Sequence, residues 1–289
     1  FRRMSDEGVS PSSVTYISVL KACGMVGSLE MGEFIHEEIK KTGLLEKDIM
    51  LGNTLVDMYA KCGMLGKAFA VFHKLPKRDV VAWNTLIAGY DQYGLSDKAL
   101  ECFWQMQDEG ISPNVVTYIC ILKVCGFAVS LDVGRDLHAE IRKQGLMQKD
   151  VVLGNTLVDM YFKCGMFEKA REVFEQIPMQ DVVSWNAIIT GYSQCGFSDE
   201  ALECFREMKT RGISPDAVTY ICVLKACGIV GSLQIGEDID AEIGKKGLLF
   251  KDVVLGTALV DMYCRCGALE KAHETFEQLP VRNLVPWNV

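Results

Sequence analysis

Side chains that could pair with a nucleobase recur along this 289-residue chain. An asparagine amide offers both a hydrogen-bond donor and an acceptor, so it can match the Watson–Crick edge of a pyrimidine. A threonine hydroxyl is a smaller donor and acceptor that leaves room for a purine. To meet successive bases one at a time, such side chains must be presented by an element that itself repeats. The side chains in question are Asn53, Asn84, Asn155, Asn186 and Thr257.

The chain repeats with a period of 102 residues, seen in SVTYISVLKACG at Ser13, VVTYICILKVCG at Val115 and AVTYICVLKACG at Ala217. Each period divides into segments of 36, 31 and 35 residues with no linker between them. Partial units occupy 1–12 and 284–289. The eight complete units are 13–48, 49–79, 80–114, 115–150, 151–181, 182–216, 217–252 and 253–283.

Each unit predicts two α-helices. In 182–216, VVSWNAIITGYSQCG carries apolar residues at helical spacing and stops at Gly196. SDEALECFREMKTRG follows, with Ser198 as the expected N-cap and Gly212 at its end. One hairpin buries too little core to stand alone, whereas stacked hairpins share a continuous one. We therefore expect an all-α fold, an α-solenoid of helix–turn–helix repeats that forms a single domain over 1–289.

Composition narrows the classes of partner. No apolar run is long enough to cross a membrane, and the net charge of −8 argues against a blanket affinity for nucleic acid. Nucleic-acid binding would therefore need a local stripe of cations. All of the twelve cysteines except Cys195 and Cys264 follow the 102-residue period, as expected of a repeated packing position and not of a disulfide framework.

The motifs VTYI, DVVSWN, LVDMYxKCG and GISPD, with the 36/31/35 cycle, closely resemble the pentatricopeptide repeat family. Tetratricopeptide repeats differ, because they keep about 34 residues and a W-x2-L-G-x2-Y pattern. More narrowly, the chain resembles the class of land-plant organellar RNA editing factors that alternates P, L and S motifs. The 35-residue units would be P motifs, the 36-residue units L motifs and the 31-residue units S motifs.

The resemblance implies a right-handed superhelix whose first helices line a concave groove for single-stranded RNA, one base per motif. It also implies that the fifth and last residues of a motif select the base and that the second residue sandwiches it. In the S and P motifs the fifth residues are Asn53, Asn84, Asn155, Asn186 and Thr257, the last residues are Asp79, Asn114, Asp181, Asp216 and Asn283, and the second residues are Met50, Val81, Val152, Val183 and Val254.

By the family's pairing rules, Asn with Asp favours U, Asn with Asn favours C over U, and Thr with Asn favours A. The L motifs carry Ile17, Ile119 and Ile221 at the fifth position. Isoleucine cannot hydrogen-bond a base, so these motifs should be spacers or weak readers. The predicted preference over 49–283 is 5′-U-(C/U)-N-U-U-N-A-3′.

Phosphate contacts require cations in spite of the acidic total. Lys61, Lys163 and Arg265 share one S-motif position, two helical turns after the base-selecting residue and on the same face. Three neutralised phosphates would give a log–log salt slope of about −2 for a single strand. The alternative is that these are solvated surface side chains. Second candidates, at one L-motif position, are Lys21, Lys123 and Lys225.

Neither a catalytic nor a metal site is predicted, and no cofactor is expected. His138-Ala139-Glu140 matches the H-x-E fragment of zinc deaminases, but their P-C-x-x-C half is missing from the sequence. The equivalents of His138 are His36 and Asp240, which favours a drifting surface position. Trp83, Trp185 and Trp287 precede the selecting positions and could stack on bases, but an inter-helix core position is the preferred interpretation.

The resemblance predicts the site-recognition part of organellar C-to-U RNA editing, in a mitochondrion or chloroplast, and not an enzyme. Its partners would be single-stranded RNA and, through the L motifs, editing cofactor proteins, with no membrane and no small-molecule substrate. A targeting peptide and a C-terminal extension would lie outside this chain, which opens and closes inside motifs. The alternative is an α-solenoid scaffold for protein partners without RNA specificity.

Overall fold

The computed structural model describes residues 1, 4, 10–248 and 252–279, and every regular element within them is helical. This confirms the predicted all-α solenoid class. Two α-helices fall in each complete repeat unit, and the short 3-10 helix η1 (Leu44–Glu46) lies near the end of the unit 13–48. The first helices are α2 (Ser13–Val26), α4 (Ile49–Lys61), α6 (Val80–Gln92), α8 (Val115–Ala128), α10 (Val151–Lys163), α12 (Val182–Gln194), α14 (Ala217–Val230) and α16 (Val253–Arg265). The second helices are α3 (Leu29–Thr42), α5 (Leu65–Lys74), α7 (Ser96–Asp108), α9 (Leu131–Lys143), α11 (Phe167–Glu175), α13 (Ser198–Thr210), α15 (Leu233–Lys246) and α17 (Leu269–Gln278).

A polar side chain caps the start of each first helix. Asp79, for example, accepts a hydrogen bond from the backbone N–H of Ala82 at 2.9 Å. Such a cap satisfies a backbone donor that the helix itself leaves without a partner. The last residue of one unit therefore sets where the next helix begins. The other capping residues are Ser12, Asp48, Asn114, Asp150, Asp181, Asp216 and Asp252.

The start of α13 differs from the prediction. Phe197 occupies the N-cap position without a side-chain hydrogen bond, and Ser198 is the buried first residue of the helix. The expectation that Ser198 caps this helix was therefore wrong. The ring of Phe197 packs against that of Phe167 with centroids 4.5 Å apart. This apolar contact anchors the turn where a polar cap was expected.

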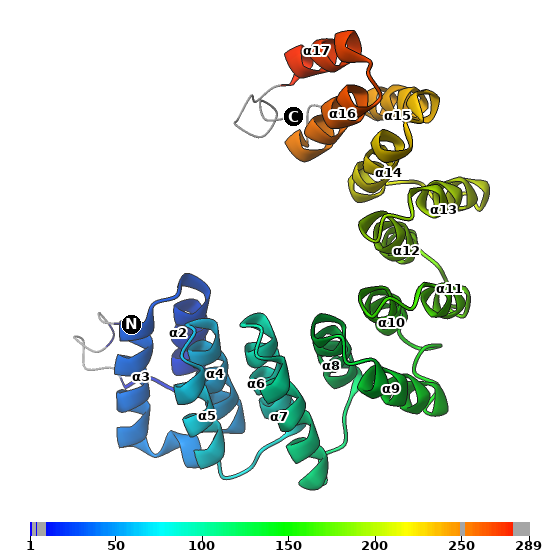
Figure 1. The fold of residues 1–289 in the computed structure, drawn as a ribbon. Helices are drawn as coiled ribbons and strands as arrows, with labels where there is room; N and C mark the ends of the chain where they lie inside the picture. The colour runs from blue at the N-terminus through cyan, green and yellow to red at the C-terminus, as the bar shows by residue number, and fades with distance from the viewer. Residues whose placement is uncertain (2–3, 5–9, 249–251, 280–289) are drawn as a thin grey trace. The chain divides into compact units, whose positions relative to one another are not determined.

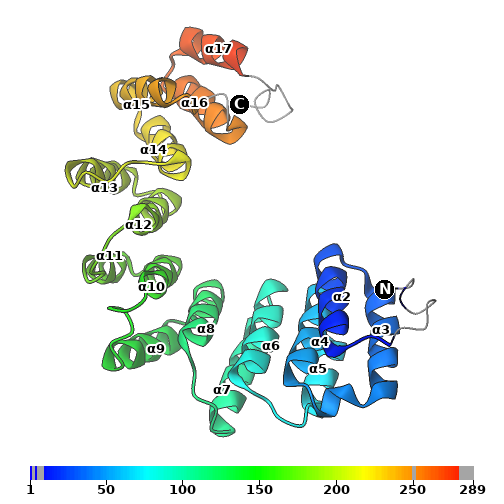
Figure 2. The ribbon, with the colours of Figure 1, turned by 180° about the vertical axis from the view of Figure 1, so that it is seen from behind.

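The repeat units are grouped in two larger compact parts of the chain, Phe1–Ile141 and Arg142–Val289. From here on, the first unit and the second unit mean these two parts. In the first unit α4 packs against both α2 and α6, and in the second unit α12 packs against both α10 and α14. Most second helices pack against two consecutive first helices, as α13 does against α12 and α14. Within each unit the first helices form one layer and the second helices another (Figures 1 and 2).

In each of the two compact parts of the chain, the core lies between the layer of first helices and the layer of second helices. Trp185 is fully buried and meets the ring of Phe174 nearly edge-on, with centroids 4.8 Å apart. Trp83 meets Phe72 in the same way at 4.6 Å. Both tryptophans therefore belong to the interior, as predicted, and are not exposed base-stacking surfaces. Trp287 lies outside the described residues.

The cysteines, all within the described part of the chain, form no disulfide. Among the described helices, none combines the length and the apolar character that a bilayer crossing requires.

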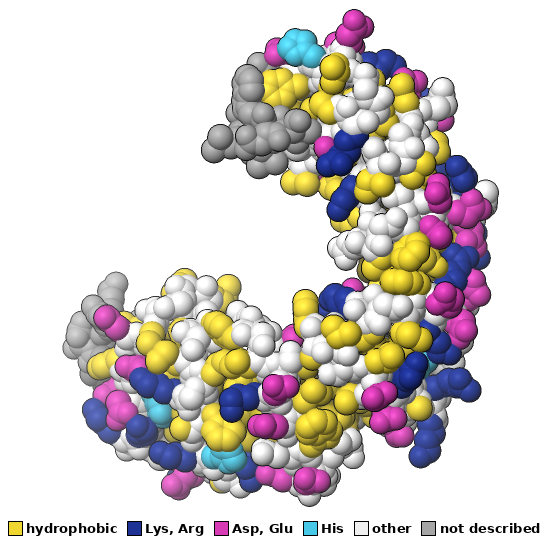
Figure 3. All heavy atoms as spheres, viewed as in Figure 1, with side chains coloured by type: hydrophobic (Ala, Val, Ile, Leu, Met, Phe, Trp, Pro, Cys, Tyr) yellow, Lys and Arg dark blue, Asp and Glu magenta, His cyan; other side chains and the backbone are white. Residues whose placement is uncertain are grey.

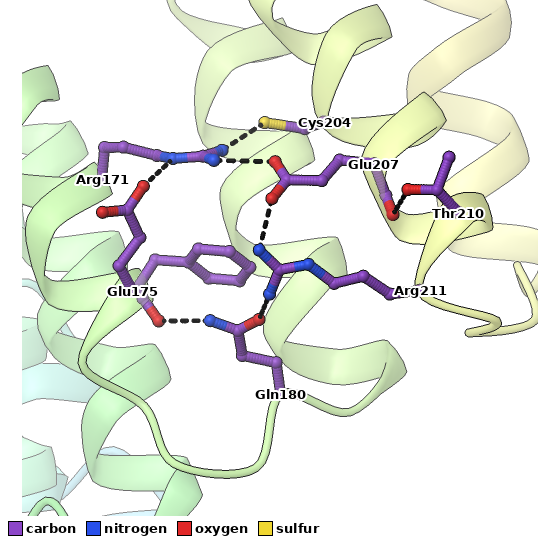
Figure 4. Close-up of polar contacts among 8 residues, drawn as sticks. Arg171, Glu175, Gln180, Cys204, Glu207, Thr210 and Arg211 are labelled. Atoms are coloured by element: carbon purple, nitrogen blue, oxygen red, sulfur yellow. Dashed lines mark hydrogen bonds and ion pairs between the residues drawn. The ribbon is translucent and has the colours of Figure 1, made fainter.

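Charged side chains join the second helices α11 and α13. Arg171 donates to Glu175 at 2.8 Å and to Glu207 at 2.7 Å, and Arg211 donates to Glu207 and to Gln180 (Figure 4). Partial burial raises the pKa of the Glu207 carboxyl, but hydrogen bonds and the charges of both arginines outweigh it and hold this pKa below its usual value. Glu207 is thus the acceptor at the centre of the contact.

The substitution Glu207→Gln is expected to lower the free energy of unfolding of the second unit by about 1 kcal/mol at neutral pH, since solvent screens part of the ion pair. A carboxyl whose pKa falls on folding stabilises the fold above its unfolded pKa, about 4.3, and loses that contribution as the pH drops through the folded value. Urea unfolding near pH 7 and near pH 3 tests this, and the deficit should shrink in acid. An equal deficit at both pH values would contradict the assignment. The control Glu203→Gln, in an exposed pair with Arg206, should have little effect.

Candidate nucleic-acid interface

The fifth and last residues of a repeat unit meet through a side-chain hydrogen bond. Asn53 Nδ2 donates to Asp79 Oδ1 at 3.1 Å, although 26 residues separate the two. The structure brings together two more predicted pairs, Asn84 with Asn114 at 3.1 Å and Asn186 with Asp216 at 3.0 and 3.1 Å. In the described part of the chain, no hydrogen bond joins the fourth pair, Asn155 and Asp181.

The last residue of a unit serves two partners at once. Asp79 Oδ1 accepts from the Asn53 amide and also from the backbone N–H that begins α6. Asp216 does the same between Asn186 and the start of α14. Partial burial raises the pKa of Asp216, but hydrogen bonds from the Thr219 backbone and from Asn186 bring this pKa below its usual value. The side chain that caps one first helix therefore also orients the amide on the preceding first helix.

A threonine that the sequence analysis missed completes two of these sites. Thr117 Oγ1 donates to Asn84 Oδ1 at 2.7 Å, and Thr219 Oγ1 donates to Asn186 Oδ1 at 2.6 Å. Each threonine also closes a capping box at the start of its helix. The VTY sequence that opens the 36-residue units was the available signal. Both amides are thus held at their oxygen as well as at their nitrogen.

The amides of Asn53 and Asn155 are held differently. Their Oδ1 atoms are buried and have no hydrogen-bond partner in the described structure. At the position equivalent to Thr117, the unit that follows Asn53 carries Ala82, which has no hydroxyl, and the unit that follows Asn155 carries Ser184, whose hydroxyl donates to Asp181 at 3.1 Å. A buried carbonyl oxygen without a partner costs free energy.

Exposed apolar side chains flank the polar pair. Met50 and Val81 are 65% and 53% exposed and line a surface cavity of about 500 Å³ together with Asn53 and Asp79. Asn53 is only 8% exposed, so the amide lies at the floor of the cavity and the apolar side chains form its walls. At the same position in later units, Val152, Val183 and Val254 are exposed as well.

Thr257 occupies the fifth position of its unit and is buried. Its hydroxyl donates to the backbone oxygen of Val253 in the same helix at 2.8 Å, a local bond typical of helical threonine. Its predicted partner Asn283 lies outside the described residues, as do 284–289. The adenine preference of this unit therefore stays a prediction.

The predicted phosphate-binding cations are ion-paired within their own helices. Lys61 Nζ lies 2.7 Å from Asp57 Oδ2, and both side chains are partly exposed. The carboxylates were not anticipated, although LVDMYxKC places Asp four residues before Lys, a helical ion-pair spacing. In the second unit, charged side chains otherwise gather over α11 and α13, away from α12 and α14 (Figure 3). The two equivalent pairs are Lys163 with Asp159 at 2.8 Å and Arg265 with Asp261 at 2.8 Å.

The H-x-E position makes an interior contact, which corrects its interpretation as a surface position. His36 Nδ1 lies 2.8 Å from Tyr59 Oη, and the equivalent Asp240 accepts a hydrogen bond from Tyr263 at 2.7 Å. His138 itself is buried. Burial lowers the pKa of His36 to about 4, so its imidazole is neutral at physiological pH. No set of three or more metal-ligating side chains gathers among the described residues.

Family models match most of the chain. The model described as the PPR repeat family matches 78–126 and 180–228, and the model described as PPR repeat matches 53–80, 155–182 and 257–284. A third, the pentatricopeptide repeat domain, matches 1–61.

Curated relatives and solved structures agree with these models. A chloroplastic pentatricopeptide repeat-containing protein of Arabidopsis thaliana is 38% identical over 96% of this chain and 44% of its own length. A putative mitochondrial one from the same plant is 37% identical over 100% of this chain and 47% of its own length. This chain thus spans about half the length of these relatives. The crystal structure of the pentatricopeptide repeat protein PPR10 in complex with an 18-nt psaJ RNA element shares the fold, with a TM-score of 0.74 and 22% identity over 95% of this chain and 41% of that one.

Proposed function

This chain belongs to the pentatricopeptide repeat family, and from that premise we propose that it binds single-stranded RNA with sequence selectivity, one base per motif. The observation that carries the proposal is the cavity in which the Asn53 amide, held by Asp79, lies between exposed Met50 and Val81. Apolar side chains on both sides suit the faces of a planar base, and the amide suits its polar edge. PPR10, which has the same fold, was crystallised with RNA.

The side chain at the fifth position sets the base in this proposal. Asn53 donates one amide hydrogen to Asp79 and retains another for a base oxygen or nitrogen. The assigned order is U for 49–79, C or U for 80–114, U for 151–181 and 182–216, and A for 253–283. Units with isoleucine at the fifth position are spacers. The bound sequence is 5′-U-(C/U)-N-U-U-N-A-3′, and Lys61, Lys163 and Arg265 contact its phosphates.

The biological role that follows is target recognition in organellar C-to-U RNA editing, without catalysis by this chain. The repeat lengths support the P, L and S class and a single solenoid over the whole chain. Chloroplastic and mitochondrial relatives support an organellar location. The 36-residue units also leave large apolar side chains exposed near the ends of their first helices, which supports contacts with editing cofactor proteins there. These side chains are Met25, Phe127 and Ile229.

The substitution Asn155→Ala is expected to weaken binding of RNA with the assigned sequence by about tenfold, the loss of one to two hydrogen bonds to a base. Fluorescence anisotropy with labelled RNA measures this, after selection from a randomised pool has tested the assigned sequence. Ile221→Ala, at the fifth position of an L motif, is the control and should change the affinity less than about twofold. Equal losses for both variants, or selection of an unrelated sequence, would contradict the proposed reading.

A further inference from the structure

Two of the three S-motif cations, Lys61 and Arg265, are held at both the stem and the head of the side chain. The Lys61 stem lies over Gly24 of the preceding first helix, where an added Cβ would stand 3.3 Å from Lys61 Cδ. Arg265 lies over Gly228 in the same manner, with a corresponding distance of 2.9 Å. A larger residue than glycine would displace either stem. The heads of the two side chains are bonded to carboxylates one turn earlier on their own helices.

The carboxylate stands between the base site and the cation. Asn53, Asp57 and Lys61 follow one another at intervals of four residues and therefore share one face of α4. Asp57 lines the same cavity as Asn53, together with Lys21 from the neighbouring helix. A nucleotide whose base enters this cavity would bring its phosphates past the ion pair of Asp57 and Lys61. The phosphate would then meet a nearly neutral ion pair and not an isolated cation.

We propose that Asp57, Asp159 and Asp261 act as built-in counterions that limit phosphate binding by Lys61, Lys163 and Arg265. The inference rests on the proposed function. A cation already paired with a carboxylate gains less from a phosphate, and the carboxylate itself repels the strand. Phosphate attraction is the same for every sequence, whereas base contacts are not. These carboxylates therefore reduce the part of RNA affinity that carries no sequence information.

A simpler role, stabilisation of the helix by ion pairs four residues apart, makes a different prediction. It requires the carboxylates for folding but leaves the salt dependence of RNA binding unchanged. The chain offers comparable pairs away from the base cavity, such as Lys271 with Glu237 at 2.6 Å between α17 and α15. Lys67 pairs with Glu33 and Lys169 with Glu172 on other second helices. Removing those carboxylates changes the net charge equally without altering the first helices.

The test compares two triple variants of the full chain. One carries Asp57→Asn, Asp159→Asn and Asp261→Asn, and the other carries Glu33→Gln, Glu172→Gln and Glu237→Gln. Binding to 5′-UCAUUAA-3′ and to a scrambled strand of the same composition is measured between about 50 and 200 mM salt. Circular dichroism melting of both variants verifies that they fold.

For the first variant, affinity for both strands is expected to rise about fivefold at low salt, and the log–log salt slope to steepen to about −2 from a shallower value in the unaltered chain. The second variant should leave both quantities close to those of the unaltered chain. If RNA is bound but the two variants behave alike, the inference is overturned and the proposed function survives. If the unaltered chain binds neither strand at low salt, the proposed function fails and the inference fails with it.

A double-mutant cycle gives a second readout that does not depend on the triple variant. Lys61→Gln should weaken RNA binding little in the unaltered chain, because Asp57 already neutralises this lysine. The same change should weaken binding about twofold more when Asp57→Asn is present. Equal effects in both backgrounds would show that the carboxylate does not restrain the cation.

Discussion

With Asn155→Thr and Asp181→Asn together, the chain is expected to prefer A over U at the fourth nucleotide of its target by about tenfold to a hundredfold, the range that base-specific hydrogen bonds provide. The hydroxyl is smaller than the amide and leaves room for a purine between Val152 and Val183, which are both exposed. Asparagine caps a helix as well as aspartate does, so α12 should still begin at Val182. Selection from a randomised RNA pool, with the unaltered chain alongside, measures the change.

The repeat supplies a matched control for this exchange. Asn53→Thr with Asp79→Asn makes the same chemical change in the unit that reads the first nucleotide. The preference for A should therefore move to the first position while U is kept at the fourth. If both double variants changed the same nucleotide, or if neither changed any, the assignment of one base to each motif would be wrong.

Replacing Trp185 with alanine is expected to lower the free energy of unfolding of the second unit by about 3–5 kcal/mol. This side chain is fully buried, packs on Phe174 at 4.8 Å and lies under the Arg211 guanidinium, which is 5.1 Å from the ring centroid. Its removal leaves a cavity between α11, α12 and α13 that these helices cannot fill without moving. Urea unfolding followed by circular dichroism measures the loss.

Trp104→Ala is the control, because Trp104 is 47% exposed on α7 and should cost less than about 1 kcal/mol. Under conditions where both variants remain folded, Trp185→Ala should bind RNA about as well as the unaltered chain. A large loss of RNA affinity without a loss of stability would instead make Trp185 a base-stacking residue, contrary to its burial.

The periodic parts of this structure were predictable because they depend on spacing alone. Helix pairs follow from apolar periodicity, and the interior place of Trp83 and Trp185 follows from their fixed distance to the start of a helix. Contacts between neighbouring units were harder to predict. The bond from Thr219 to Asn186 joins residues 33 apart, and it becomes visible only when the stacking register of α12 and α14 is known.

Two further differences have local physical causes. Asp57 lies four residues from Lys61, and the ion pair competes with the proposed RNA contact of this lysine because Asp57 also lines the cavity of Asn53. Ser198 had the residue type and the position of a cap. Phe197 occupies the cap position instead, and its ring packs on Phe167. In both cases a three-dimensional neighbour decided between chemically plausible roles.

In the units that end at Asp79, Asn114 and Asp216, the final residue makes two bonds, and these bonds have an evolutionary consequence. Because Asp79 begins α6 and also orients the Asn53 amide, a mutation there is expected to alter folding and, in the proposed function, target choice in one step. Only side chains that can start a helix are tolerated at such a site, chiefly Asp, Asn, Ser and Thr. In the proposed function, the residues available at this position for a new RNA target are therefore restricted to those that can begin a helix. The fifth position caps no helix, so we expect targets to change fastest through substitutions there.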